Sequence, residues 1–227
     1  MYTLYIGNKN YSSWSLRPWV LMRALSIPFE EKLIQFPGGD SYDFFRRVSP
    51  NGRVPCLVDG DTTVWDSLAI VEYLAERHAS VWASDARARA WSRSAAAEMH
   101  SSFGALRNIC GMNCGIRVAL RERPPALERD LARIGELWNE GLSRFGGPFL
   151  AGGGVTAVDA FYAPVVFRAQ TYGLEFGGEA DAWVARMLAH PAMREWYEAA
   201  LAEPWREKDH EGDLPRVGSL IADLRTG

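Results

Sequence analysis

The sequence has few cysteines, and it lacks both a long apolar run and a large excess of charge of one sign. Its three cysteines, Cys56, Cys110 and Cys114, are too few and odd in number for a disulfide framework, which is typical of a reducing compartment. No apolar run approaches the roughly 18 residues that span a bilayer, and residues 1–6 lack the basic segment and long apolar core of a signal peptide. We therefore expect a cytoplasmic protein with no membrane partner.

The balance of charge excludes further classes of protein. The formal net charge is −3, and only Lys9, Lys32 and Lys208 are lysines among the 25 basic residues, so no basic surface for nucleic acid is predicted. Cys110 and Cys114 lie four residues apart without other Cys or His at zinc spacing, so we predict no metal site. With 227 residues, 48% of them hydrophobic, the chain can bury a substantial core.

The first eighty residues alternate between strand and helix patterns. Apolar runs predict short strands over 4–6, 29–36, 54–58 and 62–65, and helical spacing predicts helices over 15–24 and 42–48 and from Ser67 onward. The resulting order β-α-β-α-β-β-α mixes parallel and antiparallel pairing in one small sheet. We predict an α/β domain over residues 1–79.

From residue 86 onward the sequence shows helical patterns only. One long helix is predicted over 91–110, and the apolar stripe over 127–145 is the cleanest in the chain. Thr156 and Asp159 have the spacing of a capping box ahead of an apolar helix that contains Pro164, which is expected to kink it. Two more helices should follow, the second from about Pro191. An all-helical domain over 86–227 is therefore expected.

Three short motifs of the first domain point to chemistry. The first is the hydroxyl-rich turn Tyr11-Ser12-Ser13-Trp14-Ser15 ahead of a helix, and the others are Val54-Pro55 and Asp66-Ser67. Serine hydroxyls and backbone N–H groups at a helix N-terminus are donors to an anion, such as a thiolate. Each motif alone is weak, but their order and spacing together indicate a binding site for a thiol peptide.

The whole pattern resembles the cytosolic glutathione transferase family over essentially the full length, nearest to its serine-type bacterial and zeta-like classes. The matching stretches are Ser12-Ser13-Trp14-Ser15-Leu16-Arg17, Val54-Pro55, Asp66-Ser67-Leu68-Ala69-Ile70, and Thr156-Ala157-Val158-Asp159 with Pro164. This resemblance implies a thioredoxin-like N-terminal domain with a mixed four-stranded sheet, an all-helical C-terminal domain, and a cleft between them. It also implies a homodimer that uses glutathione as cosubstrate, with no cofactor, against a small electrophile.

The resemblance assigns roles in glutathione binding to five residues. Pro55 would follow a cis bond that lets the Val54 backbone pair with glutathione like an added strand. Ser67 would bind the γ-glutamyl carboxylate at a helix N-terminus, and Asp66 its ammonium. Arg53 would meet the glycyl carboxylate. Each assignment has an alternative. Pro55 could be a trans proline that begins an edge strand, Asp66 or Ser67 could be a plain N-cap, and Arg53 could be a solvated surface residue.

The catalytic hydroxyl would come from the serine turn. A free thiol with pKa ~8.5 is only a few per cent thiolate at neutral pH. One charge-assisted hydrogen bond contributes roughly 1.5–3 kcal/mol, which lowers a pKa by about one to two units. Counting back from Arg17 as in the zeta class selects Ser12, and counting back as in the theta and delta classes selects Ser13. The zeta-like motif Ser-Ser-x-Ser-x-Arg favours Ser12. Tyr5 is a third candidate for the catalytic hydroxyl, but we interpret it as a core residue. Ser15 is expected to cap the helix. The alternative to a catalytic role is that all three serines simply cap the helix.

The electrophile site is less defined in the sequence. Trp14, His100, Met112 and Asn113, with Glu98 and Arg117, fall where the family lines this site, although a solvated helix face or a dimer contact explains them equally well. The zeta-class maleylacetoacetate isomerases have a cysteine where this chain has Trp14, and this difference weakens the hypothesis of an isomerase. We predict a glutathione transferase. The alternatives are a glutathione-dependent isomerase or dehalogenase, and a non-catalytic glutathione-binding or stress protein on the same fold.

Overall fold

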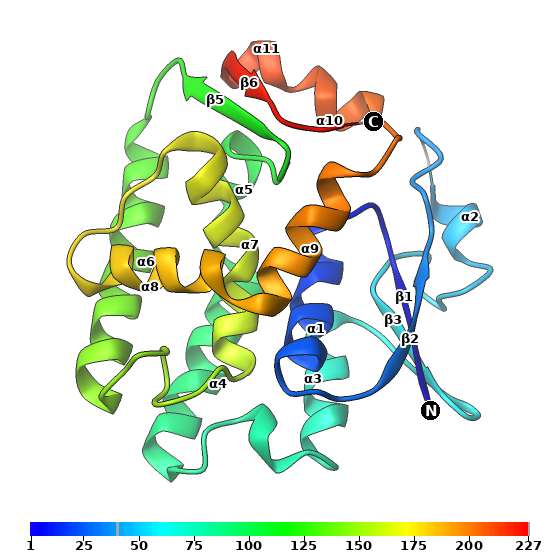
Figure 1. Cartoon of the computed structure of the whole chain (residues 1–227), viewed down its shortest axis with the longest axis vertical. Coiled ribbons are helices and arrows are strands. Elements are labelled where there is room, and N and C mark those ends of the chain that lie inside the picture. Colours follow the sequence, from blue (N-terminus) through cyan, green and yellow to red (C-terminus); the bar gives the residue numbers. More distant parts are fainter. Residues whose placement is uncertain (40, 227) are drawn as a thin grey trace.

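The computed structural model describes residues 1–39 and 41–226, and its N-terminal part is a small α/β unit. Its elements alternate along the chain and are drawn in blue and cyan in Figure 1: β1 Tyr2–Ile6, α1 Ser13–Ala24, β2 Phe29–Leu33, α2 Tyr42–Phe45, β3 Cys56–Asp59, β4 Thr62–Val64 and α3 Ser67–Ala75. The strand expected over 29–36 ends at Leu33 and the helix expected over 42–48 ends at Phe45, so both are shorter than predicted.

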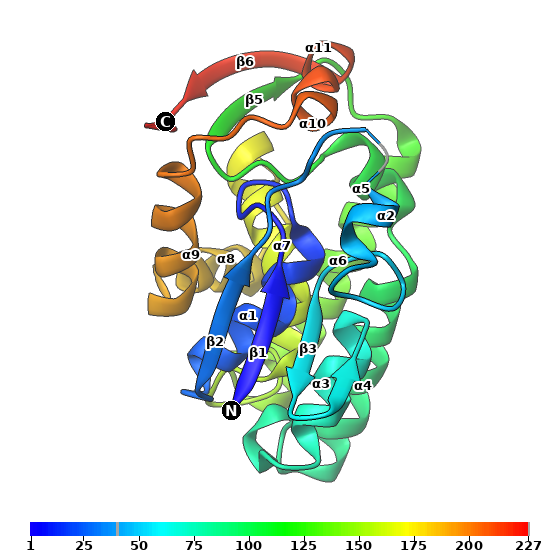
Figure 2. The same cartoon turned by 90° about the vertical axis from the view of Figure 1, so that its right-hand side faces the viewer.

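The sheet has the predicted mixed pairing. Its four strands lie in the order β2-β1-β3-β4, with β1 parallel to β2 and antiparallel to β3, and with β3 antiparallel to β4. Leu4 and Ile6 of β1 are fully buried while Tyr5 between them is half-buried, as alternation in a strand requires. Figure 2 shows α1 and α3 behind this sheet. The thioredoxin-like arrangement expected from the sequence is confirmed.

The second part of the chain is helical, as predicted, with one addition. Its elements are η1 Ala79–Val81, α4 Ala86–Ser101, α5 Gly104–Ile109, β5 Ile116–Leu120, α6 Pro125–Phe145, α7 Ala157–Tyr172, α8 Glu179–Ala189, α9 Pro191–Leu201, α10 Lys208–Gly212, α11 Leu214–Val217 and β6 Gly218–Asp223. β5 and β6 form a two-stranded antiparallel sheet that the sequence did not predict. The two strands are distant in the sequence, so no local pattern predicts their pairing.

The long helix predicted over 91–110 is wrong in one respect. The chain leaves α4 after Ser101, and Phe103 adopts a left-handed conformation with φ 62° before α5 begins. Leu106 keeps helical spacing with the residues before the break, which is why the apolar periodicity continues across it. Arg107 of α5 donates back across the break to the Ser102 carbonyl at 2.9 Å.

Helix α7 forms the centre of the molecule. It packs against α1 of the first domain and against α4, α8 and β5 of the second. Its capping box is present as predicted, with Asp159 and Thr156 bonded reciprocally, and Pro164 lies inside the helix. Because α7 is buried on nearly every side, any polar residue that it carries must find a partner inside the protein.

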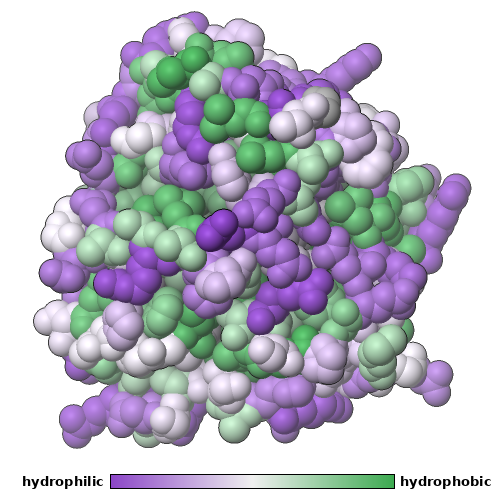
Figure 3. Space-filling model, viewed as in Figure 1, coloured by the Kyte–Doolittle hydropathy of each residue, from purple (hydrophilic) through white to green (hydrophobic). Residues whose placement is uncertain are grey.

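The surface is mostly polar, with separate apolar patches (Figure 3). Among the described residues, the large apolar side chains that are exposed include Tyr42, Phe44 and Trp65 in the first domain and Leu220, Ile221 and Leu224 near the end of the chain. None of the described helices has both the length and the apolar character needed to cross a membrane.

Candidate functional site

A cavity of about 390 Å³ lies where the two domains meet. From the first domain its lining includes the predicted residues Ser12, Ser13, Trp14, Arg53 and Val54, together with Tyr11, Phe36, Ser41, Phe45 and Gly52, which were not assigned to the site from the sequence. The second domain contributes Met112, which was predicted, and Arg107, Arg168, His210 and Asp213, which were not. A larger cavity, about 1390 Å³, lies between residues 79–88 and 143–156 and contains none of the predicted residues. We therefore place the candidate site in the smaller cavity.

The serine turn contains a short chain of hydrogen bonds. The Gly7 N–H donates to Ser15 Oγ at 3.1 Å, and Ser15 Oγ lies 2.7 Å from Ser12 Oγ. The Ser12 hydroxyl donates to Ser15 Oγ, so Ser15 Oγ accepts from both Gly7 and Ser12. This hydrogen bond orients the Ser12 hydroxyl at the cavity wall, and the hydroxyl must rotate away from Ser15 to donate to a ligand in the cavity.

The prediction that Ser15 caps α1 is wrong. The helix begins at Ser13 with Ser12 at the N-cap, and no side chain makes a capping hydrogen bond there. Ser15 therefore lies inside the first turn, where its hydroxyl bonds the preceding loop instead. Tyr5 lies in mid-strand, paired with Lys32 and Cys56, and does not line the cavity.

The backbone at the cavity floor has the expected cis bond. The Val54–Pro55 peptide bond is cis, as the resemblance implied, and Pro55 itself is buried. Within the described chain, the Val54 backbone N–H and C=O have no hydrogen-bond partner. They remain available to an extended peptide, which is the role expected of them. The neighbouring Arg53 is exposed at the rim of the cavity.

Asp66 and Ser67 stand at the N-terminus of α3. Asp66 is the N-cap, because its carboxylate accepts from the Leu68 N–H at 3.0 Å, and it lies 3.4 Å from His100 Nε2. Ser67 is fully buried and its hydroxyl accepts from Arg17 Nη1 at 3.4 Å. Neither residue lines the cavity that contains Ser12 and Ser13, called the serine cavity below. Asp66 is partly exposed whereas Ser67 is fully buried, so Asp66 is the more accessible of the two.

Trp14 is enclosed by cationic side chains. The guanidinium of Arg17 lies 4.1 Å from its ring centroid and that of Arg107 lies 5.1 Å away, while the His100 ring meets it edge-on at 5.1 Å. Burial lowers the pKa of Arg17 and of His100. The predicted His100 thus flanks the site through Trp14 and Asp66 rather than through the cavity wall.

The other residues predicted for the electrophile site divide between the cavity and the scaffold. Met112 lines the cavity, whereas Asn113 donates to Glu211 at 3.1 Å. Glu98 accepts a bidentate pair from Arg133. Arg117 donates to the Tyr197 hydroxyl at 3.0 Å. Asn113, Glu98 and Arg117 therefore hold elements of the second domain together, and the structure does not bring them into the serine cavity.

Arg168 is the main site residue that sequence reasoning missed. It is only 4% exposed, its Nε donates to the Cys110 carbonyl at 2.7 Å, and its Nη1 has no partner in the described chain. Burial, followed by repulsion from Arg107, lowers the pKa of Arg168 to about 10. An arginine within the apolar α7 sequence is the signal that could have found it, because buried cations are expected to be paired.

The cysteines do not take part in the site. All three are buried and free, and burial raises the pKa of Cys110 to about 12. Across residues 1–39 and 41–226, no group of three or more His, Cys, Asp or Glu could hold a metal ion. The polar groups that line the cavity are hydroxyls, the Val54 backbone, guanidinium groups and the side chains of His210 and Asp213.

A mixed four-stranded sheet with a cis-proline ahead of β3, followed by a helical domain whose central helix opens with a capping box, defines the glutathione transferase fold. The family model for the glutathione S-transferase N-terminal domain matches residues 11–77, and that for the C-terminal domain matches residues 84–199. The chain therefore belongs to the glutathione S-transferase family, and the prediction of a glutathione transferase is confirmed at this level.

Relatives of several classes are similar to the chain. A zeta-class glutathione S-transferase of Euphorbia esula is 26% identical over 202 residues, which cover 87% of this chain and 88% of the relative. A dichloromethane dehalogenase of Methylophilus leisingeri is 41% identical over 64 residues, covering 26% of this chain and 24% of that protein. The solved theta-class enzyme of Xanthomonas axonopodis pv. citri, with glutathione bound, has a TM-score of 0.63 at 24% identity and covers 86% of this chain and 96% of its own.

Proposed function

We propose that this protein binds glutathione as a cosubstrate in the domain-boundary cavity, lowers the pKa of its thiol through Ser12, and directs the thiolate at a small electrophile. The observation that carries the proposal is that Ser12 lines the same cavity as the unpaired backbone of Val54, with its hydroxyl oriented by a hydrogen bond to Ser15 Oγ. A serine hydroxyl can rotate, so on binding it exchanges the neutral Ser15 acceptor for the anionic thiolate, which is the stronger partner. Val54 supplies the backbone edge for the peptide.

The direct test uses the whole protein and glutathione alone. Isothermal titration should show binding, and ultraviolet difference spectra should show thiolate formed at neutral pH on binding. Conjugation is then followed with a general electrophile such as 1-chloro-2,4-dinitrobenzene. Absence of both binding and thiolate absorbance would overturn the proposal and favour a non-catalytic protein on the same fold.

A glutathione-dependent dehalogenase is the second candidate, because a dehalogenase matches the chain at 41% identity over 64 residues. The two activities differ in the fate of the thiol peptide. Conjugation consumes glutathione stoichiometrically, whereas dehalogenation of a dihalomethane and isomerisation both return it. Measuring free thiol during turnover of each electrophile class therefore separates them.

Asp66 is proposed to bind the γ-glutamyl ammonium of glutathione. Replacing Asp66 by Asn keeps a good N-cap for α3 but removes the charge. A charge-assisted hydrogen bond is worth roughly 1.5–3 kcal/mol, so the Asp66→Asn change should raise the KM for glutathione about tenfold or more, with little change in kcat. Steady-state kinetics with varied glutathione measure this. An unchanged KM would place the ammonium elsewhere.

Arg107 and Arg168 make the electrophile side of the cavity cationic. We expect a preference for an electrophile that carries a carboxylate, because the Arg168 Nη1 lacks a partner. The measurement compares 4-(bromomethyl)benzoate with its neutral amide in the wild-type protein and in Arg168→Gln. Loss of one charge-assisted bond should lower kcat/KM for the acid about tenfold and leave the amide nearly unchanged. An equal fall in kcat/KM for the acid and the amide would contradict this role, and would mean that Arg168 acts on the glutathione thiolate or stabilises the fold.

We propose further that the protein acts as a cytoplasmic homodimer in detoxification. Tyr42, Phe44 and Trp65 are exposed apolar side chains of the first domain, and a second copy of the chain would cover them. Sedimentation equilibrium of wild type and of Phe44→Ser tests this assembly. A wild-type monomer at micromolar concentration would contradict it.

A further inference from the structure

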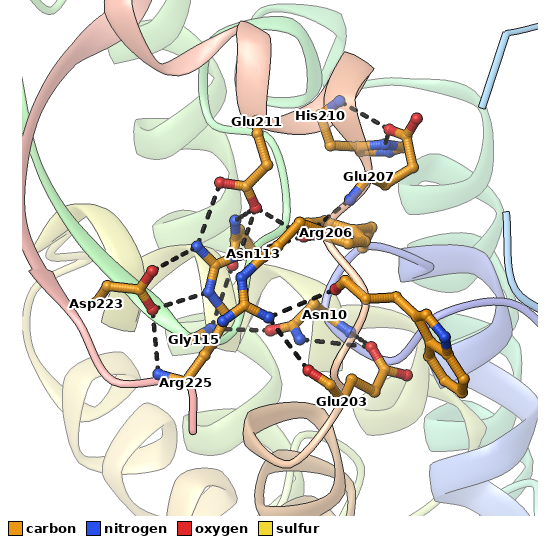
Figure 4. A network of polar contacts seen from close by, with 12 residues as sticks. Asn10, Asn113, Gly115, Glu203, Arg206, Glu207, His210, Glu211, Asp223 and Arg225 are labelled. Atoms are coloured by element: carbon orange, nitrogen blue, oxygen red, sulfur yellow. Dashed lines mark hydrogen bonds and ion pairs between the residues drawn. The ribbon is translucent and has the colours of Figure 1, made fainter. Parts of the chain in front are cut away.

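The last part of the chain, residues 203–226, crosses the loop and turn that carry the serines. It comprises α10, α11 and β6, and in Figure 2 these elements lie above the end of β1. Pairing of β6 with β5 fixes the end of this segment to the second domain. Residues from the two ends of the chain therefore meet beside the cavity, in the polar network of Figure 4.

The loop ahead of the serines is held by one buried carboxylate. Glu203 is 5% exposed and accepts from the Lys9 N–H at 2.6 Å and from the Asn10 N–H at 3.3 Å. The Asn10 side chain donates to the Ala200 carbonyl at 2.5 Å and accepts from the Gly115 N–H at 3.1 Å. These bonds fix residues 9 and 10 to the second domain.

Tyr11 extends the same attachment to the serine turn. Its hydroxyl donates to Glu211 at 2.6 Å and accepts from Arg225 Nη1 at 3.2 Å. The backbone N–H groups of Tyr11 and Ser12 both donate to the Asn8 carbonyl, so these adjacent residues belong to one hydrogen-bonded turn. The contacts of the Tyr11 ring therefore bear on the position of the Ser12 hydroxyl.

Arg225 is clamped from two sides. Its Nε and Nη2 donate to the Asp223 carboxylate at 2.8 and 2.7 Å, and its Nη1 and Nη2 donate to Glu211 (Figure 4). The Arg225 side chain is only 4% exposed. Paired bidentate contacts of this kind give the guanidinium one orientation, which suits a positioning role.

Gly115 provides the space for this arrangement. A Cβ atom built on Gly115 would lie 2.2 Å from Arg225 Cγ and 2.6 Å from its Cδ. Because the guanidinium is held at its far end, the stem of Arg225 cannot swing away without breaking those contacts. The Gly115 site therefore offers a way to displace Arg225 without changing any charge.

We propose that Glu211 and Arg225 are positioning residues, which act through the Tyr11 hydroxyl to aim Ser12 at the glutathione thiol. The end of the chain thereby sets how strongly the bound thiol is acidified. This inference rests on the proposed function of Ser12. Hydrogen bonds weaken steeply when their geometry is lost, so a small shift of the turn changes the thiol pKa more than it changes binding of the rest of the peptide.

The test measures the thiol pKa of bound glutathione by ultraviolet titration in Tyr11→Phe, Gly115→Ala and the control Ile221→Thr. Ile221 lies in β6 of the same segment, is 68% exposed and does not line the cavity. Tyr11→Phe and Gly115→Ala should raise the thiol pKa by about half to one unit, which lowers kcat/KM at pH 7 about threefold to tenfold. The loss should disappear at a pH above the thiol pKa, with the KM for glutathione nearly unchanged. Ile221→Thr should match the wild type.

Each other outcome has a distinct meaning. An equal loss at every pH in Tyr11→Phe and Gly115→Ala would show a structural role and overturn the positioning role, as would pH profiles that match the wild type. A wild-type protein that forms no thiolate on binding glutathione would overturn the proposed function of Ser12, and the positioning role with it. The wild-type titration and the variant titrations thus separate the two failures.

Discussion

Ser12→Ala is expected to leave glutathione bound but its thiol mostly protonated at neutral pH. The hydroxyl contributes one charge-assisted hydrogen bond to the thiolate, worth roughly 1.5–3 kcal/mol, so the thiol pKa should rise by about one to two units. The rate of conjugation at pH 7 should then fall about tenfold to a hundredfold. Difference spectra of the complex, and the pH profile of kcat/KM, measure the same shift independently.

Two neighbouring variants serve as controls for Ser12→Ala. Ser13 lines the cavity, but no hydrogen bond in the described chain orients its hydroxyl as Ser15 Oγ orients that of Ser12, so Ser13→Ala should lose little activity. Ser15→Ala removes the acceptor that orients the Ser12 hydroxyl and leaves the Gly7 N–H unsatisfied. It should therefore show an intermediate rise in thiol pKa together with lower stability. A larger loss for Ser13→Ala than for Ser12→Ala would transfer the role to Ser13.

The sequence was sufficient where a signal is local. The order of strands and helices in the first domain and the capping box of α7 follow from patterns within a few residues, whereas the cis bond before Pro55 was implied by the family resemblance. The physical basis of the local signals is side-chain periodicity and cap hydrogen bonds.

The missing features depend on contacts between distant residues. Phe103 takes a left-handed conformation that no local preference favours, so the break between α4 and α5 must come from tertiary packing. The strands β5 and β6 pair across much of the second domain. Glu211 meets Tyr11 from 200 positions away in the sequence. A single sequence carries no information about such pairs until the fold brings them together.

Asp159→Asn is expected to cause the largest loss of stability. The Asp159 carboxylate is fully buried and acts only as an acceptor, from the Leu150 and Thr156 N–H groups at 2.9 and 3.0 Å and from Trp183 Nε1 at 3.1 Å. An asparagine of the same size must turn its NH₂ group toward one of these donors. Leaving buried donors unsatisfied costs roughly 1–3 kcal/mol each, so the loss should be about 3 kcal/mol.

Asp85 provides the matched control, because it also caps a helix but at the surface. It accepts from the Arg87 and Ala88 N–H groups at the start of α4. Asparagine is an equally good N-cap in water, so Asp85→Asn should change the free energy of unfolding by less than about 0.5 kcal/mol. Urea unfolding followed by tryptophan fluorescence compares the two variants. Since α7 also carries Arg168 into the cavity, Asp159→Asn should lose activity in step with its folded fraction; equal stabilities of the two variants would contradict a buried, donor-enclosed role for Asp159.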